Sequence, residues 1–226
     1  MIYLPFMATF LTNKPCEMNT KIEKLTLAAQ LLFIWILYQE TDKYYISVAL
    51  DTLHVSNMTL TRAYRQLCNT KLFEEHKDGR KIYLTTHLNK FELFNQMKHY
   101  LQSPIQKQGY ILKSDINDNM ILSGESALSQ YTFINPPRLK TYAIDKLNNK
   151  NISLQKEYYS QEEQVGLQIW NYDPLLFSQD KKSIDIISLI ISLLDNMDER
   201  LEIEIDQLVK NLLNKKDDGI IKICLS

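Results

Sequence analysis

Apolar residues recur every three to four positions in the segment that follows residue 20. Leu25, Leu32 and Ile36 lie on one side of this helical pattern, and aromatic residues add bulk on a second side. The spacing predicts a helix that is capped by Asn19 or Thr20 and continues to position 39. Because the helix is apolar around so much of its circumference, we expect it to be buried on more than one face, against a second domain or a dimer mate.

The pattern after position 45 predicts two short helices joined by a tight turn. Ser47 is expected to cap the first helix, residues 48–53, whose apolar side chains, including that of Val48, point inward. After the turn, Ser56 or Asn57 would cap a second helix that ends near position 69. The inner face of this second helix repeats at positions i, i+3, i+4 and i+7 and consists of Leu60, Ala63, Tyr64 and Leu67.

The outer face of the second helix carries polar and basic side chains. No acidic residue occurs between Leu53 and Phe73. An ordinary solvated helix surface would explain a polar stripe, but the lack of acids favours a surface that binds DNA. On such a surface, guanidinium groups can reach guanine edges, and amides and hydroxyls can reach bases or phosphates. The candidate DNA-contacting residues of this face are Ser56, Asn57, Thr59, Thr61, Arg62, Arg65 and Gln66.

A β-hairpin with a basic tip is predicted directly after this helix. Residues 72–73 and 82–84 are expected to form its strands, and Gly79 supplies the tight bend. Lys77, Arg80 and Lys81 at the tip would contact the phosphate backbone or the minor groove, which gives affinity without base identity. The hairpin therefore extends the predicted DNA-binding surface.

The segment SVALDTLHVSNMTLTRAYRQL, followed by LFEEHKDGRKIYLTT, resembles the winged-helix domain of bacterial MarR-like regulators. The resemblance implies a winged helix-turn-helix fold and double-stranded DNA as the partner. A linking helix is predicted over residues 87–101, where Ser103-Pro104 would end it. The predicted organisation is an N-terminal arm (1–19), a winged helix-turn-helix domain (20–102) and a C-terminal domain (103–226).

The second half of the chain has a mixed pattern. Extended segments are expected at 105–113, 141–144 and about 165–172, and a helix from Gly124 to Tyr131. A buried helix, 184–194, and a final amphipathic helix with Leu201, Ile205, Leu208 and Leu212 inside would follow. The predicted class is α+β, with an N-terminal winged helix-turn-helix and a C-terminal mixed α/β domain.

The stretches SGESALSQYT, TYAI, LQIWNYDPL and IDIISLIISLLDNMDERLEIEIDQLV resemble the C-terminal domain of regulators related to AbiEi-type antitoxins. The resemblance implies a nucleotidyltransferase-like domain, in which active members carry a Gly-Ser pair and then a strand with two carboxylates that hold Mg²⁺. Here Gly124-Glu125-Ser126 replaces that pair, and Asp145 is the only acid on the following strand. We therefore predict no catalytic residue, metal site or cofactor, and read Gly124-Glu125-Ser126 as a strand-to-helix turn.

Composition limits the remaining possibilities. The formal net charge is -1, so contact with DNA must come from local charge. Between His54 and Thr86, six Lys and Arg residues outnumber three acids. Cys16, Cys68 and Cys224 are widely spaced and form no CxxC motif, which favours a reducing cytoplasm.

Neither apolar run of the sequence is long enough to cross a bilayer. Residues 1–11 lack a basic start and contain Pro5, and the run 184–194 is also short. We expect the first run to be an arm packed on the body, with a membrane or partner anchor as the alternative. An acidic cluster near the C-terminus is either a surface for a basic toxin or a solvated helix face. It comprises Asp195, Asp198, Glu199, Glu202, Glu204 and Asp206.

Two hypotheses about function follow from these patterns. The first is a cytoplasmic, sequence-specific transcriptional regulator, such as the antitoxin or autorepressor of a toxin-antitoxin or phage-defence locus. Its partners would be double-stranded DNA and a toxin or other protein bound by the C-terminal domain, with no membrane involved. The chain would bind DNA either as a homodimer or as a monomer on repeated sites. The second is a nucleotidyltransferase-like enzyme that holds nucleic acid with the winged helix. The lack of paired carboxylates favours the first hypothesis.

Overall fold

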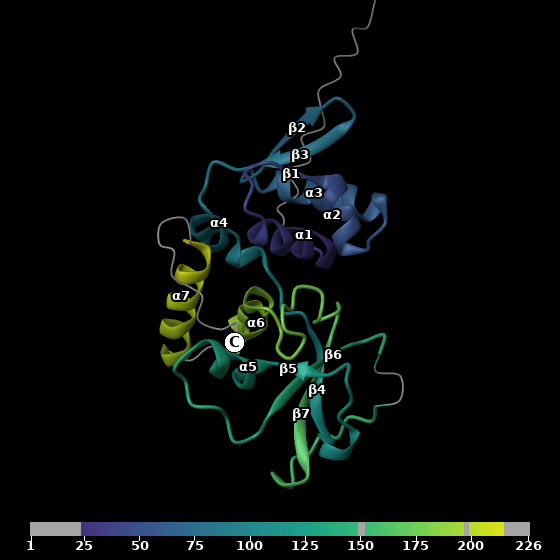
Figure 1. Cartoon of the computed structure of the whole chain (residues 1–226), viewed down its shortest axis with the longest axis vertical. Coiled ribbons are helices and arrows are strands. Elements are labelled where there is room, and N and C mark those ends of the chain that lie inside the picture. The colour runs from purple at the N-terminus through teal and green to yellow at the C-terminus, as the bar shows by residue number, and fades with distance from the viewer. Residues whose placement is uncertain (1–23, 149–151, 197–198, 215–226) are drawn as a thin grey trace, which may run out of the picture.

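Two β-sheets lie at opposite ends of the structure, with helices between and beside them (Figure 1). The computed structural model describes residues 24–148, 152–196 and 199–214. The α+β class predicted from the sequence is confirmed. The elements of the first half are α1 (Leu27–Tyr38), β1 (Tyr44–Tyr45), α2 (Ile46–Leu53), α3 (Asn57–Asn69), β2 (Glu74–Asp78), β3 (Lys81–Thr85) and α4 (Lys90–Met97). Their sheet is antiparallel and has the order β1-β3-β2.

The described part of the second half contains a four-stranded sheet and three α-helices. The sheet has the order β4-β7-β6-β5; β6 and β7 are parallel, and the other neighbours are antiparallel. The elements are β4 (Ile105–Leu112), β5 (Ile121–Leu122), α5 (Gly124–Tyr131), β6 (Thr141–Asp145), β7 (Gln164–Trp170), α6 (Ile186–Leu193) and α7 (Glu199–Leu213). Short 3-10 turns are formed by Lys98–Tyr100, Lys113–Asp115 and Leu194–Asn196. The predicted extended segments and the helix from Gly124 to Tyr131 are therefore present.

Helix α1 is buried on more than one face, as its apolar pattern predicted. Every residue from Ala29 to Leu37 is buried. One side of α1 packs against α3 (Figure 1), and Tyr38 at its C-terminal end reaches the start of α6 in the second half. The Tyr38 hydroxyl donates to Asp185 Oδ1 at 2.7 Å and accepts from the backbone N–H of Ile187 at 3.2 Å. The second half of the same chain therefore covers the face that the sequence left open to a domain or a dimer mate.

The two halves share one apolar core. Its buried members come from α1, α3 and α4 of the first half and from α5, α6 and α7 of the second. The Gln30 side chain ties α1 to the segment that leads into β4, because it donates to the Gln102 carbonyl at 3.0 Å and accepts from the Gln102 N–H at 2.9 Å. The core thus continues across position 103, where the sequence predicted a domain boundary.

Several predicted helix ends are wrong. Helix α1 begins after Thr26, whose Oγ1 accepts from Ala29 N at 3.4 Å; the predicted caps, Asn19 and Thr20, lie outside the described residues. Ser47 does not cap α2, because the preceding Tyr45 is paired in β1 and the helix starts directly from that strand at Ile46. Val48 is exposed, because Ala49 and Leu53, with half-buried Ile46 and Leu50, form the inner stripe of α2.

The predicted linking helix, 87–101, is shorter than expected. Asn89 caps α4, because its Oδ1 accepts from Glu92 N at 2.8 Å. Glu92 Oε2 in turn accepts from the Asn89 N–H at 3.4 Å, and this capping box places the helix start at Lys90. A 3-10 turn follows Met97, so Ser103-Pro104 does not end the helix.

The first strand of the hairpin also starts later than predicted. Residues 72–73 do not belong to β2, because Phe73 is buried in the core and packs edge-on against Phe33, with ring centroids 6.5 Å apart. Lys71, with a φ of 63°, turns the chain out of α3 just before this point. The strand therefore begins at Glu74.

The second sheet is covered on both faces. Ala143 and Trp170 belong to the large core that includes α5 and α6. Ile144 belongs to a smaller cluster on the other side, against which Ile152 and Leu154 pack. The predicted strand at about 165–172 is wrong at its end, because β7 stops at Trp170 and Tyr172 lies beyond it.

The last two helices lie where the sequence predicted them, but α6 begins later and the inner face of α7 differs in part from the prediction. Helix α6 begins at Ile186 because Asp185 caps it, accepting from Ser188 N at 2.9 Å. In α7, Leu201 and Ile205 are buried as predicted, whereas Leu208 and Leu212 are half-buried. Val209 and Leu213 complete its inner face.

Candidate nucleic-acid interface

The inner face of α3 is fixed by packing. Its four predicted core residues, Leu60, Ala63, Tyr64 and Leu67, are all buried. At the start of the helix, Ser56 Oγ accepts from Thr59 N at 3.1 Å, which satisfies one of the free N–H groups of the first turn. The burial of one face determines which side chains the helix presents on the other.

The exposed stripe of α3 runs through positions i, i+3, i+4 and i+7. Arg62 and Arg65 are exposed, and within the described ranges neither has a carboxylate at ion-pair distance. Thr61 is half-buried, and its hydroxyl donates to Asn57 O at 2.8 Å. Met58, 66% exposed, begins the same stripe. The stripe therefore combines two unpaired cations with a large apolar side chain.

Met58 was not among the candidates from sequence, because an apolar side chain in a helix pattern is normally assigned to the core. The register nevertheless contains the signal. Positions 58, 61, 62 and 65 are related by helical spacing and lie opposite the stripe that begins at Leu60.

Four of the predicted contact residues have hydrogen-bond partners inside the protein, Thr61 among them. Gln66 is half-buried, and its Oε1 accepts from the N–H of Thr26 at 3.0 Å and from its hydroxyl at 2.8 Å. Gln66 thereby ties α3 to the residue that caps α1. Ser56 and Thr59 contact each other through their hydroxyls at 2.8 Å. Asn57, by contrast, is exposed at the first position of α3.

The tip of the β2–β3 hairpin is basic, as predicted. Lys77, Arg80 and Lys81 are exposed, and none of them forms an ion pair with another residue that the structure describes. Nearby acids have other neighbours: Glu74 lies 3.1 Å from His87 Nε2, and Asp78 accepts from the Tyr45 hydroxyl at 3.4 Å. The three cations are therefore free to meet a polyanion.

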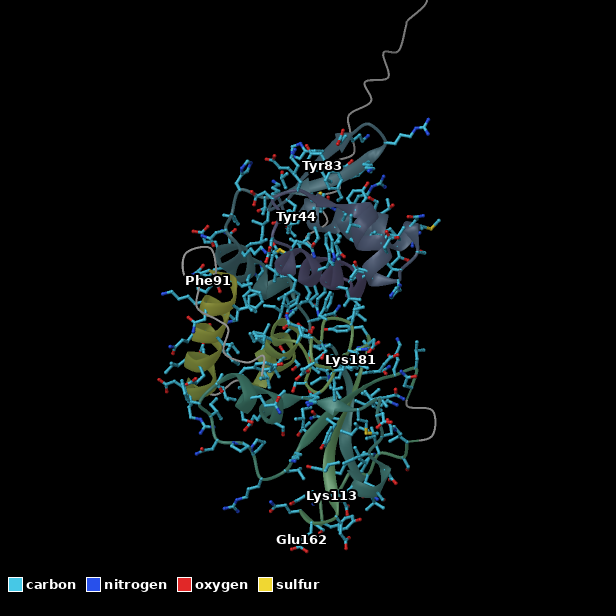
Figure 2. The ribbon with its side chains drawn as sticks, in the orientation of Figure 1. Tyr44, Tyr83, Phe91, Lys113, Glu162 and Lys181 are labelled. Carbon is cyan, nitrogen blue, oxygen red and sulfur yellow. The ribbon has the colours of Figure 1, made fainter. Side chains whose placement is uncertain are left out.

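Aromatic side chains cluster around Tyr83 on the three-stranded sheet. Figure 2 labels Tyr83 at this end of the molecule, with Tyr44 nearby in the first strand. The Tyr83 ring lies 5.2 Å from the ring of His76 and 5.3 Å from that of Tyr45, and Lys43 Nζ lies 5.5 Å from its centre. These cross-strand contacts stabilise the pairing of β3 with β2 and β1, and so fix the orientation of the hairpin relative to the rest of the sheet.

The hairpin turn depends on Gly79, which has a φ of +59°. Gly79→Ala is expected to lower the free energy of unfolding by about 1–2 kcal/mol, because a Cβ strains this left-handed conformation. Urea denaturation measures the effect. The matched control is Arg80→Ala at the second turn position, where φ is not positive, and a change within about 0.5 kcal/mol is expected. Equal stability of the two variants would contradict the assignment of strain to Gly79.

In the second half, the Gly124-Glu125-Ser126 segment forms the predicted strand-to-helix turn. Gly124 has a φ of +55° and begins α5. Ser126 Oγ accepts from Thr141 N at 3.0 Å, and so joins α5 to the start of β6. Asp145, at the end of β6, is 8% exposed. Within the described part of the chain, no group of three or more His, Cys, Asp or Glu side chains is placed to hold a metal ion.

The other candidate groups of the sequence are dispersed. Burial, with a smaller contribution from Glu75, raises the pKa of the Cys68 thiol to about 11; Cys16 and Cys224 lie outside the described residues. In the acidic cluster, Asp206 lies 3.8 Å from Lys98 of the first half, and Asp198 is not described. Part of this cluster therefore faces a neighbouring helix of the same chain.

No protein-family model, curated protein or solved structure matches this chain. Functional conclusions consequently depend on the geometry of α3 and the hairpin. None of the helices among the described residues is long and apolar enough to cross a membrane.

Proposed function

We propose that the first half of the chain is a winged-helix DNA-binding domain and that the protein is a sequence-specific transcriptional regulator. The observation that carries the proposal is the exposed stripe of α3, where Arg62 and Arg65 have no acidic partner among the described residues and lie beside a hairpin with a basic tip. The order helix, strand, two helices and hairpin supports it, since a winged helix-turn-helix has this arrangement.

In the proposed complex, α3 lies in the major groove of double-stranded DNA. Arg62 and Arg65 donate to the O6 and N7 atoms of guanines, and Asn57 at the start of the helix reaches a base or a phosphate. Lys77, Arg80 and Lys81 contact the neighbouring backbone. Gln66 has a positioning role, because its bonds to Thr26 fix α3 against α1.

The second half is proposed to bind a protein partner, such as a toxin, and to carry out no chemistry. Ser126 and Gly124 are supported as structural residues because they join α5 to β6. The hydrogen bonds of Tyr38 with Asp185 and Ile187 of this half, and the shared apolar core, connect it to the DNA-reading half. A partner bound there would therefore be held in a defined position relative to α3.

The direct test is footprinting of the full chain on the DNA upstream of its own coding sequence, at low salt, where phosphate contacts are strongest. A protected region that persists against excess random duplex is expected. A blank footprint at low salt would overturn the proposal.

Removing the charges of the hairpin tip is expected to weaken binding equally on all sequences. The variant Lys77→Ala/Arg80→Ala/Lys81→Ala should reduce the slope of log affinity against log salt by about 2 to 3, because each phosphate contact contributes about 0.9. The slope is measured by titrating the footprinted duplex and a random duplex with the protein at salt concentrations from about 50 to 200 mM.

The matched control removes three exposed lysines from the second half. Lys107, Lys113 and Lys140 lie outside the hairpin, and Figure 2 shows Lys113 at the end of the molecule away from Tyr83. Their combined replacement by Ala should leave the salt slope unchanged. An equal loss of slope in both triple variants would mean that overall charge, and not the hairpin, governs binding.

A further inference from the structure

We propose that Met58 reads the 5-methyl group of a thymine in the DNA site, an inference that rests on the proposed function. Met58 is 66% exposed and occupies the second position of α3. It stands on the same stripe as Arg62 and Arg65, one and two turns before them. An apolar side chain in this register adds to the stripe a chemistry that the arginines lack.

The packing of the protein gives Met58 no role within the described core. It belongs to neither apolar cluster, and it is absent even from the partly buried side chains that pack against them. Its neighbour Leu60, by contrast, is 1% exposed. With respect to the residues that the structure describes, Met58 therefore projects from α3 as a large apolar group outside the core, next to exposed Asn57 and in line with exposed Arg62.

Only one apolar group is displayed by base edges in the major groove, the 5-methyl of thymine. The first residues of a recognition helix are the ones that contact base edges. A thioether side chain is flexible and polarisable, so it can close around a methyl group without exact prepositioning. From these properties we expect Met58 to contact the thymine methyl group, while Arg62 and Arg65 bind guanines.

The helical rise also fixes where the thymine lies. Four residues of α-helix, the separation of Met58 and Arg62, span about 6 Å. Successive base pairs are about 3.4 Å apart, so the thymine should lie one or two base pairs from the guanine that Arg62 contacts. The preferred half-site thus contains thymine and guanine at this short separation.

The test begins with selection of duplexes from a random library by the full chain. In the selected duplex, thymines are replaced one at a time by deoxyuridine, which removes only the methyl group. For the wild type, one such replacement near the Arg62-dependent guanine is expected to lower affinity about fourfold, the effect of losing one buried methyl group. For Met58→Ala the same replacement should have no effect, and Met58→Leu should retain most of it.

Ile203→Ala is the matched control, since Ile203 is 64% exposed on α7; it should behave as the wild type. A uracil effect of equal size in the wild type and in Met58→Ala, or no uracil effect at any position, would overturn the role of Met58 while leaving DNA binding intact. If no duplex is enriched at low salt, the proposed function fails, and the inference fails with it.

Discussion

Replacing Asp185 with alanine is expected to lower the free energy of unfolding by about 2–4 kcal/mol. Asp185 is 7% exposed, and its Oδ1 accepts both from Ser188 N at 2.9 Å and from the Tyr38 hydroxyl at 2.7 Å. The alanine variant loses the cap of α6, at about 1 kcal/mol, and leaves the Tyr38 hydroxyl without its acceptor, at about 1–3 kcal/mol. Urea denaturation of the full chain measures the loss.

Asp185→Asn is the matched control. An amide oxygen in the place of Oδ1 can keep both hydrogen bonds while removing the charge, so this variant should retain most of the wild-type stability at neutral pH. Similar losses in Asp185→Ala and Asp185→Asn would mean that the charge, and not the two hydrogen bonds, stabilises this point of contact between the halves.

Comparing the stability of the wild type with that of Asp185→Asn as a function of pH isolates the effect of protonating Asp185. Burial raises the pKa of this carboxyl, and hydrogen bonds from Ser188 and Tyr38 oppose the shift without cancelling it. The folded protein therefore takes up a proton at a higher pH than the unfolded chain, whose value is about 3.9. As pH falls through the folded pKa, the wild type gains stability relative to Asp185→Asn, and the gain is complete below about pH 3.9.

The tyrosine hydroxyls close to Asp185 do not interfere with this measurement. Burial, followed by the nearby carboxylate, raises the pKa of both Tyr38 and Tyr172, so both stay protonated over the acidic range. A difference in stability between wild type and Asp185→Asn that does not change between neutral pH and pH 4 would contradict the raised pKa of Asp185.

The local patterns of the sequence predicted those parts of the fold that local physics determines. The inner face of α3 follows from apolar residues spaced at 3.6 per turn, and the hairpin turn follows from a glycine that tolerates positive φ. Burial of α1 on more than one face follows from its apolar circumference. In each case the cause lies within a few residues of its effect.

Features that depend on distant partners could not be found in this way. Gln66 is a polar residue of α3 in the sequence, and its partner Thr26 lies 40 positions away. Tyr38 and Asp185 are 147 positions apart. The predicted start of β2 is wrong because the burial of Phe73 against Phe33, a tertiary contact, outweighs the preference of Phe73 for a strand.

The combined variant Arg62→Ala/Arg65→Ala is expected to lose the largest part of specific DNA binding. Each arginine is expected to contribute about 1–3 kcal/mol through bidentate bonds to guanine. Affinity for the selected duplex should therefore fall at least about tenfold, and more if the two effects add, since 1.4 kcal/mol corresponds to a factor of ten. Affinity for random duplex should fall much less, because only the phosphate contribution changes there.

The stability of this double variant should match that of the wild type, because both arginines are exposed and neither has an ion-pair partner in the described chain. Arg138→Ala, at an exposed position outside α3 and the hairpin, is the control and should bind both duplexes as the wild type does.

Gln66→Ala should behave differently from both variants. Loss of its hydrogen bonds to Thr26 weakens the attachment of α3 to α1 and therefore lowers stability together with binding. Equal losses on selected and random duplex in the Arg62→Ala/Arg65→Ala protein would mean that the arginines contact phosphates alone, and sequence would then have to be read by other side chains of α3.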